Sequence, residues 1–216
     1  MIVNVHKILY HTTAEGFGHR ACIWFQGCSR HCKGCMAKDT WDAECGIKMD
    51  TESILQRIFL EASIPGVVFA DREQSKNMVG IEGVTFLGGE PFEQPEALLE
   101  LTSRVKEKEL SVMVFTGYTI EQLQTLGNPT INRCLKNIDL LIDGAYIEEK
   151  RDLSRPWTGS SNQRYLFLTN RYSEEDLRLQ KNRVEIRVSK DGKITINGMA
   201  DFEKVVSKGL CDNNAM

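Results

Sequence analysis

The stretch that decides the fold class is Gly83-Val-Thr-Phe-Leu-Gly-Gly-Glu-Pro91. Its first five residues suit a short buried strand, and the Gly-Gly-Glu-Pro run that follows predicts a loop. Apolar residues then recur at helical spacing between residues 95 and 108, at Leu98, Leu99, Leu101 and Val105. Together these segments form one strand-loop-helix unit.

Units of the same kind are expected on both sides of this stretch. Upstream, two strands over residues 2–10 and 19–27 precede a helix that begins after an N-cap at Asp50-Thr51-Glu52-Ser53 and ends near Pro65. Downstream, strands are expected over residues 111–115 and 138–142, with helices through residues 123–126 and 131–135 between them. Alternating strands and helices predict an α/β fold with a parallel sheet, whose site lies on the loops after the strands.

The remaining segments indicate no domain boundary. Residues 70–80 are polar and predict a surface excursion, while strands over 184–188 and 193–196 flank a Ser189-Lys-Asp-Gly192 hairpin turn, before a short helix near 201–206. With 216 residues, the chain is long enough for one core without requiring a second. We therefore predict a single domain over residues 1–216.

Composition excludes several classes of protein. The formal charge of −3, from 27 Lys and Arg against 30 Asp and Glu, provides no broad field for a polyanion, so no nucleic acid partner is expected. The longest apolar run, Ala21 to Phe25, is far short of the roughly 20 residues that span a bilayer. The N-terminus also lacks the zones of a secretory signal, which predicts a cytoplasmic protein with reduced thiols.

Three of the seven cysteines lie in one short stretch, Cys28-Ser-Arg-His-Cys32-Lys-Gly-Cys35, directly after a predicted strand. Three thiols in eight residues can reach one metal centre, and thiolates at this density favour a soft metal. A closed cluster or structural zinc normally has four protein ligands, so this loop leaves one metal position open. Zinc with His31 as fourth ligand and reduced core cysteines are the competing interpretations.

This loop resembles the CxxxCxxC loop of the radical S-adenosylmethionine (SAM) superfamily. The resemblance implies that Cys28, Cys32 and Cys35 hold three irons of a 4Fe-4S cluster and act in catalysis, while the fourth iron binds SAM. Gly34 stands where the family commonly has an aromatic residue, and Met36 follows the last cysteine. Both are expected to lie beside the adenine of SAM through their backbone.

Other segments resemble particular members of this superfamily. Gly88-Gly89-Glu90-Pro91 is similar to the family's GGE motif, which implies that Glu90 contacts the amino group of SAM, and the glycines let backbone approach it closely. The flanks 16–20 and 38–41 look like those of glycyl-radical activating enzymes, and segments 140–146 and 152–163 are similar to anaerobic ribonucleotide reductase activating enzymes. Thr116 and Asp143, each closing a strand, are further candidates for SAM contacts, although a turn and a helix cap are equal alternatives.

The resemblance covers residues 5 to 163 and implies a partial (β/α)6-type TIM barrel, to which residues 164–216 add a hairpin and a helix. It implies an enzyme that splits SAM into methionine and a 5′-deoxyadenosyl radical, and that installs a glycyl radical on a partner such as an anaerobic ribonucleotide reductase. A flavodoxin- or ferredoxin-type protein would supply the electron. The alternatives are modification of a ribosomal peptide or a nucleotide-like metabolite and, from another class, a zinc-binding interaction module.

Overall fold

The computed structural model describes residues 1–63 and 80–200, which form one seven-stranded sheet and one two-stranded sheet. The expected excursion over 70–79 and the expected helix near 201–206 lie outside the described residues. The strands, in chain order, are β1 Ile2–Thr12, β2 Arg20–Phe25, β3 Ile47–Asp50, β4 Gly83–Gly88, β5 Ser111–Phe115, β6 Leu140–Asp143, β7 Arg164–Phe167, β8 Val184–Val188 and β9 Ile194–Gly198.

The large sheet has the strand order β3-β1-β2-β4-β5-β6-β7. Its centre, β2-β4-β5-β6, is parallel, and this confirms the predicted α/β class with a parallel sheet. Both edges are antiparallel, because β1 pairs with β2 and β3 on one side and β7 pairs with β6 on the other. Neither edge strand β3 nor β7 was expected from the sequence.

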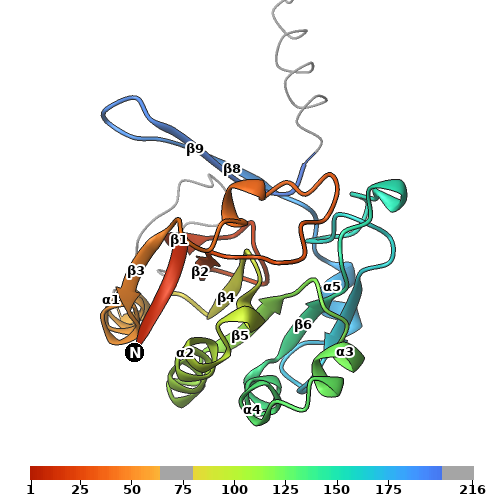
Figure 1. Cartoon of the computed structure of the whole chain (residues 1–216). Coiled ribbons are helices and arrows are strands. Elements are labelled where there is room, and N and C mark those ends of the chain that lie inside the picture. The colour runs from red at the N-terminus through yellow and green to blue at the C-terminus, as the bar shows by residue number, and fades with distance from the viewer. Residues whose placement is uncertain (64–79, 201–216) are drawn as a thin grey trace, which may run out of the picture.

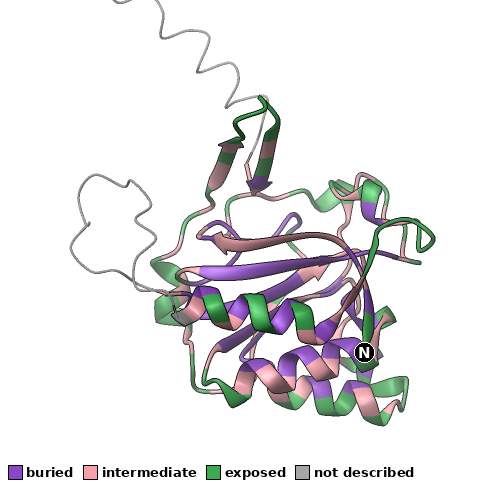
Figure 2. Cartoon of the chain, turned by 90° about the vertical axis from the view of Figure 1, so that its left-hand side faces the viewer, coloured by how far each residue is buried: buried purple, intermediate pink, exposed green. Residues whose placement is uncertain are grey.

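The helices α1 Thr51–Ser63, α2 Pro95–Glu107 and α4 Pro129–Asn137 lie side by side along one face of the sheet (Figure 1). Two shorter α-helices are α3 Ile120–Thr125 and α5 Glu174–Arg178, and three short 3-10 helices cover Lys38–Thr40, Pro91–Glu93 and Glu148–Lys150. Each of the three long helices turns a buried stripe to the sheet and an exposed stripe to solvent (Figure 2). This one-sided pattern is the reason that apolar spacing alone predicts these helices.

Strand β5 shows how the alternation of side chains divides the core between the two faces of the sheet. Val112 and Val114 pack in the cluster that the helices cover, whereas Met113 packs in a second cluster on the opposite face. Successive side chains of a strand point to opposite faces, so a strand buried on both sides carries a continuous apolar run. Phe17 and Trp157, both from loops, cover the second face.

Arg20 ties the amino ends of the parallel strands together. Its side chain is fully buried and donates hydrogen bonds to Thr85 Oγ1 at 2.7 Å, to Ser111 Oγ at 2.9 Å and to the carbonyl oxygens of Phe17 and Val84 at 3.0 and 2.9 Å. A buried guanidinium is retained at acceptable cost only when its N–H groups find acceptors. This network fixes the end of the sheet that lies opposite the cysteine loop.

The hairpin β8–β9, which the sequence predicts, projects from the body of the molecule (Figures 1 and 2). At its base, Glu185 accepts hydrogen bonds from Thr12 Oγ1 at 2.8 Å and from the backbone N–H of Thr13 at 2.6 Å. Asn197 donates to Thr12 Oγ1 at 3.0 Å. Residues beyond 163 are therefore joined to the end of β1 by polar contacts of the hairpin and to β6 by the pairing of β7.

Candidate cluster and S-adenosylmethionine site

The cysteine loop begins where β2 ends and is shaped by backbone hydrogen bonds. The N–H of Gly27 donates to the carbonyl of Thr40 at 2.8 Å, and the N–H of Cys28 donates to the carbonyl of Trp41 at 3.0 Å. Gly27 has φ of 100°, a conformation that glycine adopts without strain. The loop thus leaves the sheet at Cys28 and returns alongside its own start at Trp41.

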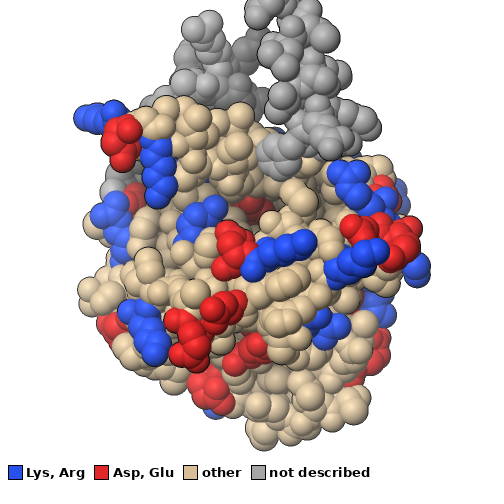
Figure 3. Space-filling model, turned by 45° about the horizontal axis from the view of Figure 1, so that its top comes forward, with Lys and Arg blue, Asp and Glu red and all other residues tan. Residues whose placement is uncertain are grey.

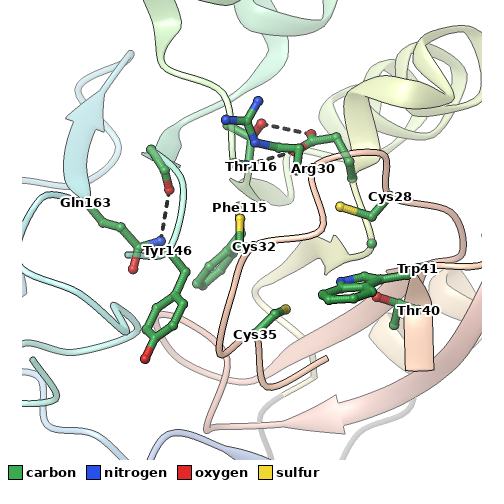
Figure 4. Close-up of a pocket in the computed structure, with 15 residues that line it drawn as sticks. Cys28, Arg30, Cys32, Cys35, Thr40, Trp41, Phe115, Thr116, Tyr146 and Gln163 are labelled. Atoms are coloured by element: carbon green, nitrogen blue, oxygen red, sulfur yellow. Dashed lines mark hydrogen bonds between the residues drawn. The ribbon is translucent and has the colours of Figure 1, made fainter. Parts of the chain in front are cut away.

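The three predicted cluster ligands come together in one cavity of about 150 Å³ (Figure 4). Cys28, Cys32 and Cys35 line it with Trp41 on one side and Tyr146 on the other. The rest of the wall is formed by Arg30, Thr40, Gly88, Gly89, Glu90, Phe115, Thr116, Gly117, Gly144 and Gln163. Within residues 1–63 and 80–200, no group of three or more His, Cys, Asp or Glu side chains is arranged to hold a single metal ion. The thiols line the wall of a shared space instead.

The two glycines of the predicted GGE motif pack the loop after β4 directly against the cysteine loop. The N–H of Glu90 donates to the carbonyl of Gly27 at 2.8 Å, and the N–H of Gly89 donates to the carbonyl of Phe25 at 2.9 Å. A Cβ added at Gly89 would lie 2.2 Å from the Gly27 oxygen, and one added at Gly88 would lie 2.7 Å from the Phe25 nitrogen. Glycine is therefore required here for backbone-to-backbone contact between the two loops.

Glu90 is almost completely buried and is held by three donors. One carboxylate oxygen accepts from Thr116 Oγ1 at 2.8 Å and from the N–H of Phe92 at 3.1 Å, and the other accepts from the N–H of Gly117 at 2.8 Å. Burial raises the pKa of Glu90 to about 7, and the three hydrogen bonds oppose this rise. An ammonium group entering the cavity would favour the ionised form of this carboxyl.

Thr116, a candidate for a SAM contact, lines the cavity, and its hydroxyl donates to Glu90 at 2.8 Å. Asp143 does not line the cavity. Its fully buried carboxylate accepts from the N–H of Ile120 at 2.8 Å and from Arg164 at 2.9 and 2.6 Å. Asp143 therefore stabilises the start of α3 and joins it to β7, which matches the cap interpretation of this residue.

Neither Gly34 nor Met36 is among the lining residues. A Cβ at Gly34 would lie 2.8 Å from Glu148 Oε1, so this glycine faces the segment after β6. Met36 is 77% exposed. An ion pair of 2.9 Å between Lys33 and Glu148 also joins the cysteine loop to that segment.

Sequence reasoning missed Arg30 and the aromatic wall of the cavity. Arg30 sits between the first two cysteines, and its guanidinium lies 4.5 Å above the Tyr118 ring. Trp41 stacks on His31 at a centroid distance of 4.6 Å, so His31 packs against a ring of the same loop. The position of Arg30 inside the motif was the available signal, whereas Tyr146 is brought in only by tertiary folding.

The donor set fits a cysteine-bound iron-sulfur cluster. The three sulfurs are partly buried, and burial raises the pKa of the Cys28 thiol, partly offset by the N–H groups of Arg30 and His31. The N–H of Ala37 points to Cys35 Sγ at 3.4 Å. Backbone N–H groups directed at cysteine sulfur are the contacts that stabilise and tune such clusters.

Comparisons with known proteins agree with this site. A family model described as a 4Fe-4S single cluster domain matches residues 14–166. The chain is similar to anaerobic ribonucleoside-triphosphate reductase-activating proteins from Pasteurella multocida (31% identity, covering 74% of this chain and 95% of the relative), Vibrio cholerae (28%, 74% and 96%) and Enterobacteria phage T4 (29%, 75% and 92%).

One solved structure, the crystal structure of QueE from Escherichia coli, aligns with 55% of this chain and 54% of that chain, at 20% identity and a TM-score of 0.40. That likeness is too low to bear on the assignment. The family match spans most of the chain and includes the three cysteines and the Gly-Gly-Glu motif. The chain therefore belongs to the 4Fe-4S single cluster domain family of radical SAM proteins, together with the anaerobic ribonucleoside-triphosphate reductase-activating proteins.

Proposed function

We propose that this chain is a radical SAM enzyme that installs a glycyl radical on an anaerobic ribonucleotide reductase. The observation that carries the proposal is the meeting of three loop cysteines with Gly88, Gly89 and Glu90 in one cavity. The relatives named as reductase-activating proteins support the choice of partner.

In this proposal Cys28, Cys32 and Cys35 hold a 4Fe-4S cluster. The described residues that line the cavity include no fourth cysteine and no histidine, so three protein ligands leave one iron for SAM. When bound and reduced, the cluster supplies the electron that splits SAM into methionine and a 5′-deoxyadenosyl radical. The protein holds the cluster and SAM in the orientation that the reaction needs, and it keeps water from the radical.

Glu90 is proposed to bind the amino group of SAM. A carboxylate offers about four acceptor positions, and three are used by Thr116, Gly117 and Phe92. The remaining position can accept an ammonium N–H as a charge-assisted hydrogen bond. Thr116 acts by positioning Glu90. Gly34 and Met36 remain proposals for the adenine, through backbone only, since the side chain of Met36 is directed to solvent.

The parallel strands β2, β4, β5 and β6 are proposed to be the core of a partial TIM barrel whose open side admits a loop of the partner. Asp143 supports these strands by accepting a hydrogen bond from Arg164 of β7.

We also propose a flavodoxin- or ferredoxin-type electron donor and a cytoplasmic location. Positive and negative side chains are interspersed on the face seen in Figure 3, which suits a protein partner better than a nucleic acid. No helix among the described residues has the length and apolar character needed to span a membrane.

The test is anaerobic reconstitution with iron and sulfide, followed by incubation with SAM, a reductant and the anaerobic reductase of the same genome. We expect a brown protein with about four irons per chain, 5′-deoxyadenosine as product and a glycyl radical signal on the reductase by electron paramagnetic resonance. Cys32→Ala should abolish all three. Cys45→Ala is the matched control, because this exposed thiol lies outside the cavity, and it should retain them.

Other outcomes would contradict the proposal in distinguishable ways. Cleavage of SAM with no radical on the reductase would redirect the search to a ribosomal peptide or a nucleotide-like metabolite. A colourless protein that takes up zinc and never iron would support an interaction module instead. Loss of the cluster in Cys45→Ala would show that the ligand assignment is wrong.

A further inference from the structure

The two intervals between the cysteines of the loop are held in different ways. Between Cys32 and Cys35 the backbone closes its own turn, because the N–H of Cys35 donates to the carbonyl of Cys32 at 3.1 Å. Among the described residues, no backbone-to-backbone hydrogen bond joins two residues of the first interval, 28–32. The conformation of this first interval therefore depends on its contacts with other parts of the chain.

Each of the three residues inside the first interval has such a contact. Arg30 and His31 each stack on an aromatic ring through their side chains. Ser29 is bound by Glu93, which belongs to the turn after β4. The Ser29 contact differs from the other two because it holds the main chain of the loop as well as a side chain.

Glu93 binds Ser29 through both of its carboxylate oxygens. One oxygen accepts from the N–H of Ser29 at 2.9 Å and from Ser29 Oγ at 2.5 Å, and the other accepts from the same N–H at 3.2 Å. The two residues lie 64 positions apart in the sequence, so only the folded chain brings them together. Hydrogen bonds from a backbone N–H to a carboxylate are roughly twice as strong as those between neutral groups. Glu93 thus holds the main chain at the residue directly after Cys28.

The residues on either side of Glu93 fix its position. Phe92 is buried in the core. The side chain of Gln94 donates to the carbonyls of Asn4 and Gln26 at 2.9 and 3.0 Å, and it accepts from the N–H of Asn4 at 2.8 Å. The turn that carries Glu93 is therefore fixed to the first two strands of the sheet.

We propose that Glu93 is a positioning residue for the cluster, which holds the interval between Cys28 and Cys32 in the conformation that binds iron. Glu93 does not line the cavity, so it acts on the ligands through Ser29. This inference rests on the proposed function, through its cluster ligands, and does not depend on which protein is the partner. It also gives the turn after β4 two roles, since Glu90 of the same turn is proposed to bind SAM.

The ion pair between Lys33 and Glu148 is the corresponding contact of the second interval, and it should matter less. Its two side chains are 80% and 42% exposed, and exposed ion pairs contribute little to stability. The second interval also closes its own backbone turn, whereas the first does not. The two carboxylates therefore provide a comparison within one loop.

The test measures how fast reconstituted protein loses its cluster to an excess of an iron chelator without oxygen, followed by the loss of brown colour. Glu93→Ala should speed this loss about tenfold, the lower end of the effect of residues that support metal ligands. Glu93→Gln keeps an acceptor for Ser29 without the charge, and its rate should lie between those of Glu93→Ala and wild type. Glu148→Gln should change the rate less than about twofold.

Glu96→Ala is the matched control, because it removes the same charge from an exposed position three residues further along the chain. It should release iron at the wild-type rate. Because Ser29 and Glu93 are both exposed, the melting temperature of the apoprotein should change by less than about 2 °C in Glu93→Ala.

Three results would overturn the inference. Release at the wild-type rate from Glu93→Ala would show that Ser29 needs no support. Equal acceleration in Glu96→Ala would assign the effect to net charge, and a large fall in the melting temperature of the Glu93→Ala apoprotein would show a merely structural role. Wild-type protein that takes up no iron would instead refute the proposed function itself.

Discussion

Replacing Gly89 with alanine should separate the two loops that build the cavity. The added Cβ would lie 2.2 Å from the Gly27 oxygen and 3.1 Å from the Thr40 oxygen, and both neighbours are backbone atoms that no rotamer change can move. Carbon–oxygen contacts are normally about 3.3 Å or longer, so the loops must part by about 1 Å. The strain should lower stability by about 1–3 kcal/mol, as overpacking does elsewhere.

The larger effect should be on activity. A displacement of about 1 Å at a catalytic centre can reduce the rate about 100-fold. Gly89→Ala moves Glu90 relative to the cysteines, since the N–H of Glu90 donates to Gly27 in the same contact. We therefore expect the initial rate of 5′-deoxyadenosine formation, measured by chromatography on the reconstituted enzyme, to fall about 100-fold with iron content largely retained.

Gly127→Ala is the matched control. Gly127 has φ of 62° and no atom within 4 Å of an added Cβ, so the substitution introduces backbone strain without a collision, at a residue that does not line the cavity. It should lower the melting temperature slightly and leave SAM cleavage at the wild-type rate. Wild-type activity and an unchanged melting temperature in Gly89→Ala would refute the reasoning, because the two backbones would then have room for a methyl group.

Two further predictions concern buried charged groups. Arg20→Met removes the hydrogen-bond donors that Thr85, Ser111 and several carbonyl groups share, so the free energy of unfolding should fall by about 3 kcal/mol or more, or about 6–12 °C in melting temperature. Arg171→Met, at an exposed position, should change the melting temperature by less than about 1 °C. Equal effects of the two substitutions would refute the role of the network. Because burial raises the pKa of Glu90 to about 7, the folded state binds a proton more tightly than the unfolded state, and stability from this group is lost as pH rises from about 5 to 8. Urea unfolding of cluster-free protein should show a loss of up to about 3 kcal/mol over this range that is absent in Glu90→Gln, and parallel pH profiles would contradict it.

Sequence patterns predicted the elements that bury one stripe or one continuous run of side chains. Strands β2, β4, β5 and β6 and helices α1, α2 and α4 belong to this group, because burial imposes a period on their residues. The edge strands β3 and β7 were missed for a physical reason. Residues 47–50 are exposed or half-buried without alternation, and they become a strand only by pairing with β1.

The candidate site likewise contains some residues that the sequence could predict and others that it could not. The three cysteines and Glu90 could be predicted because their chemistry and spacing lie within short motifs. Asp143 could not be placed from sequence, since its carboxylate is directed away from the cavity by Ile120 and Arg164, which lie 23 residues before it and 21 residues after it. The role of Arg30 likewise depends on Tyr118, which folding brings beneath it.

The backbone bonds that shape the cysteine loop have a consequence for how the protein matures. The contacts of Gly27 with Thr40 and of Cys28 with Trp41 involve no sulfur, so they form when the polypeptide folds. The iron-sulfur cluster is then expected to assemble in a loop that is already folded, unlike the metal site of a zinc finger, where metal uptake and folding are one event. Insertion and loss of the iron should therefore be reversible without unfolding of the chain. Purified apoprotein should still be able to take up iron and sulfide.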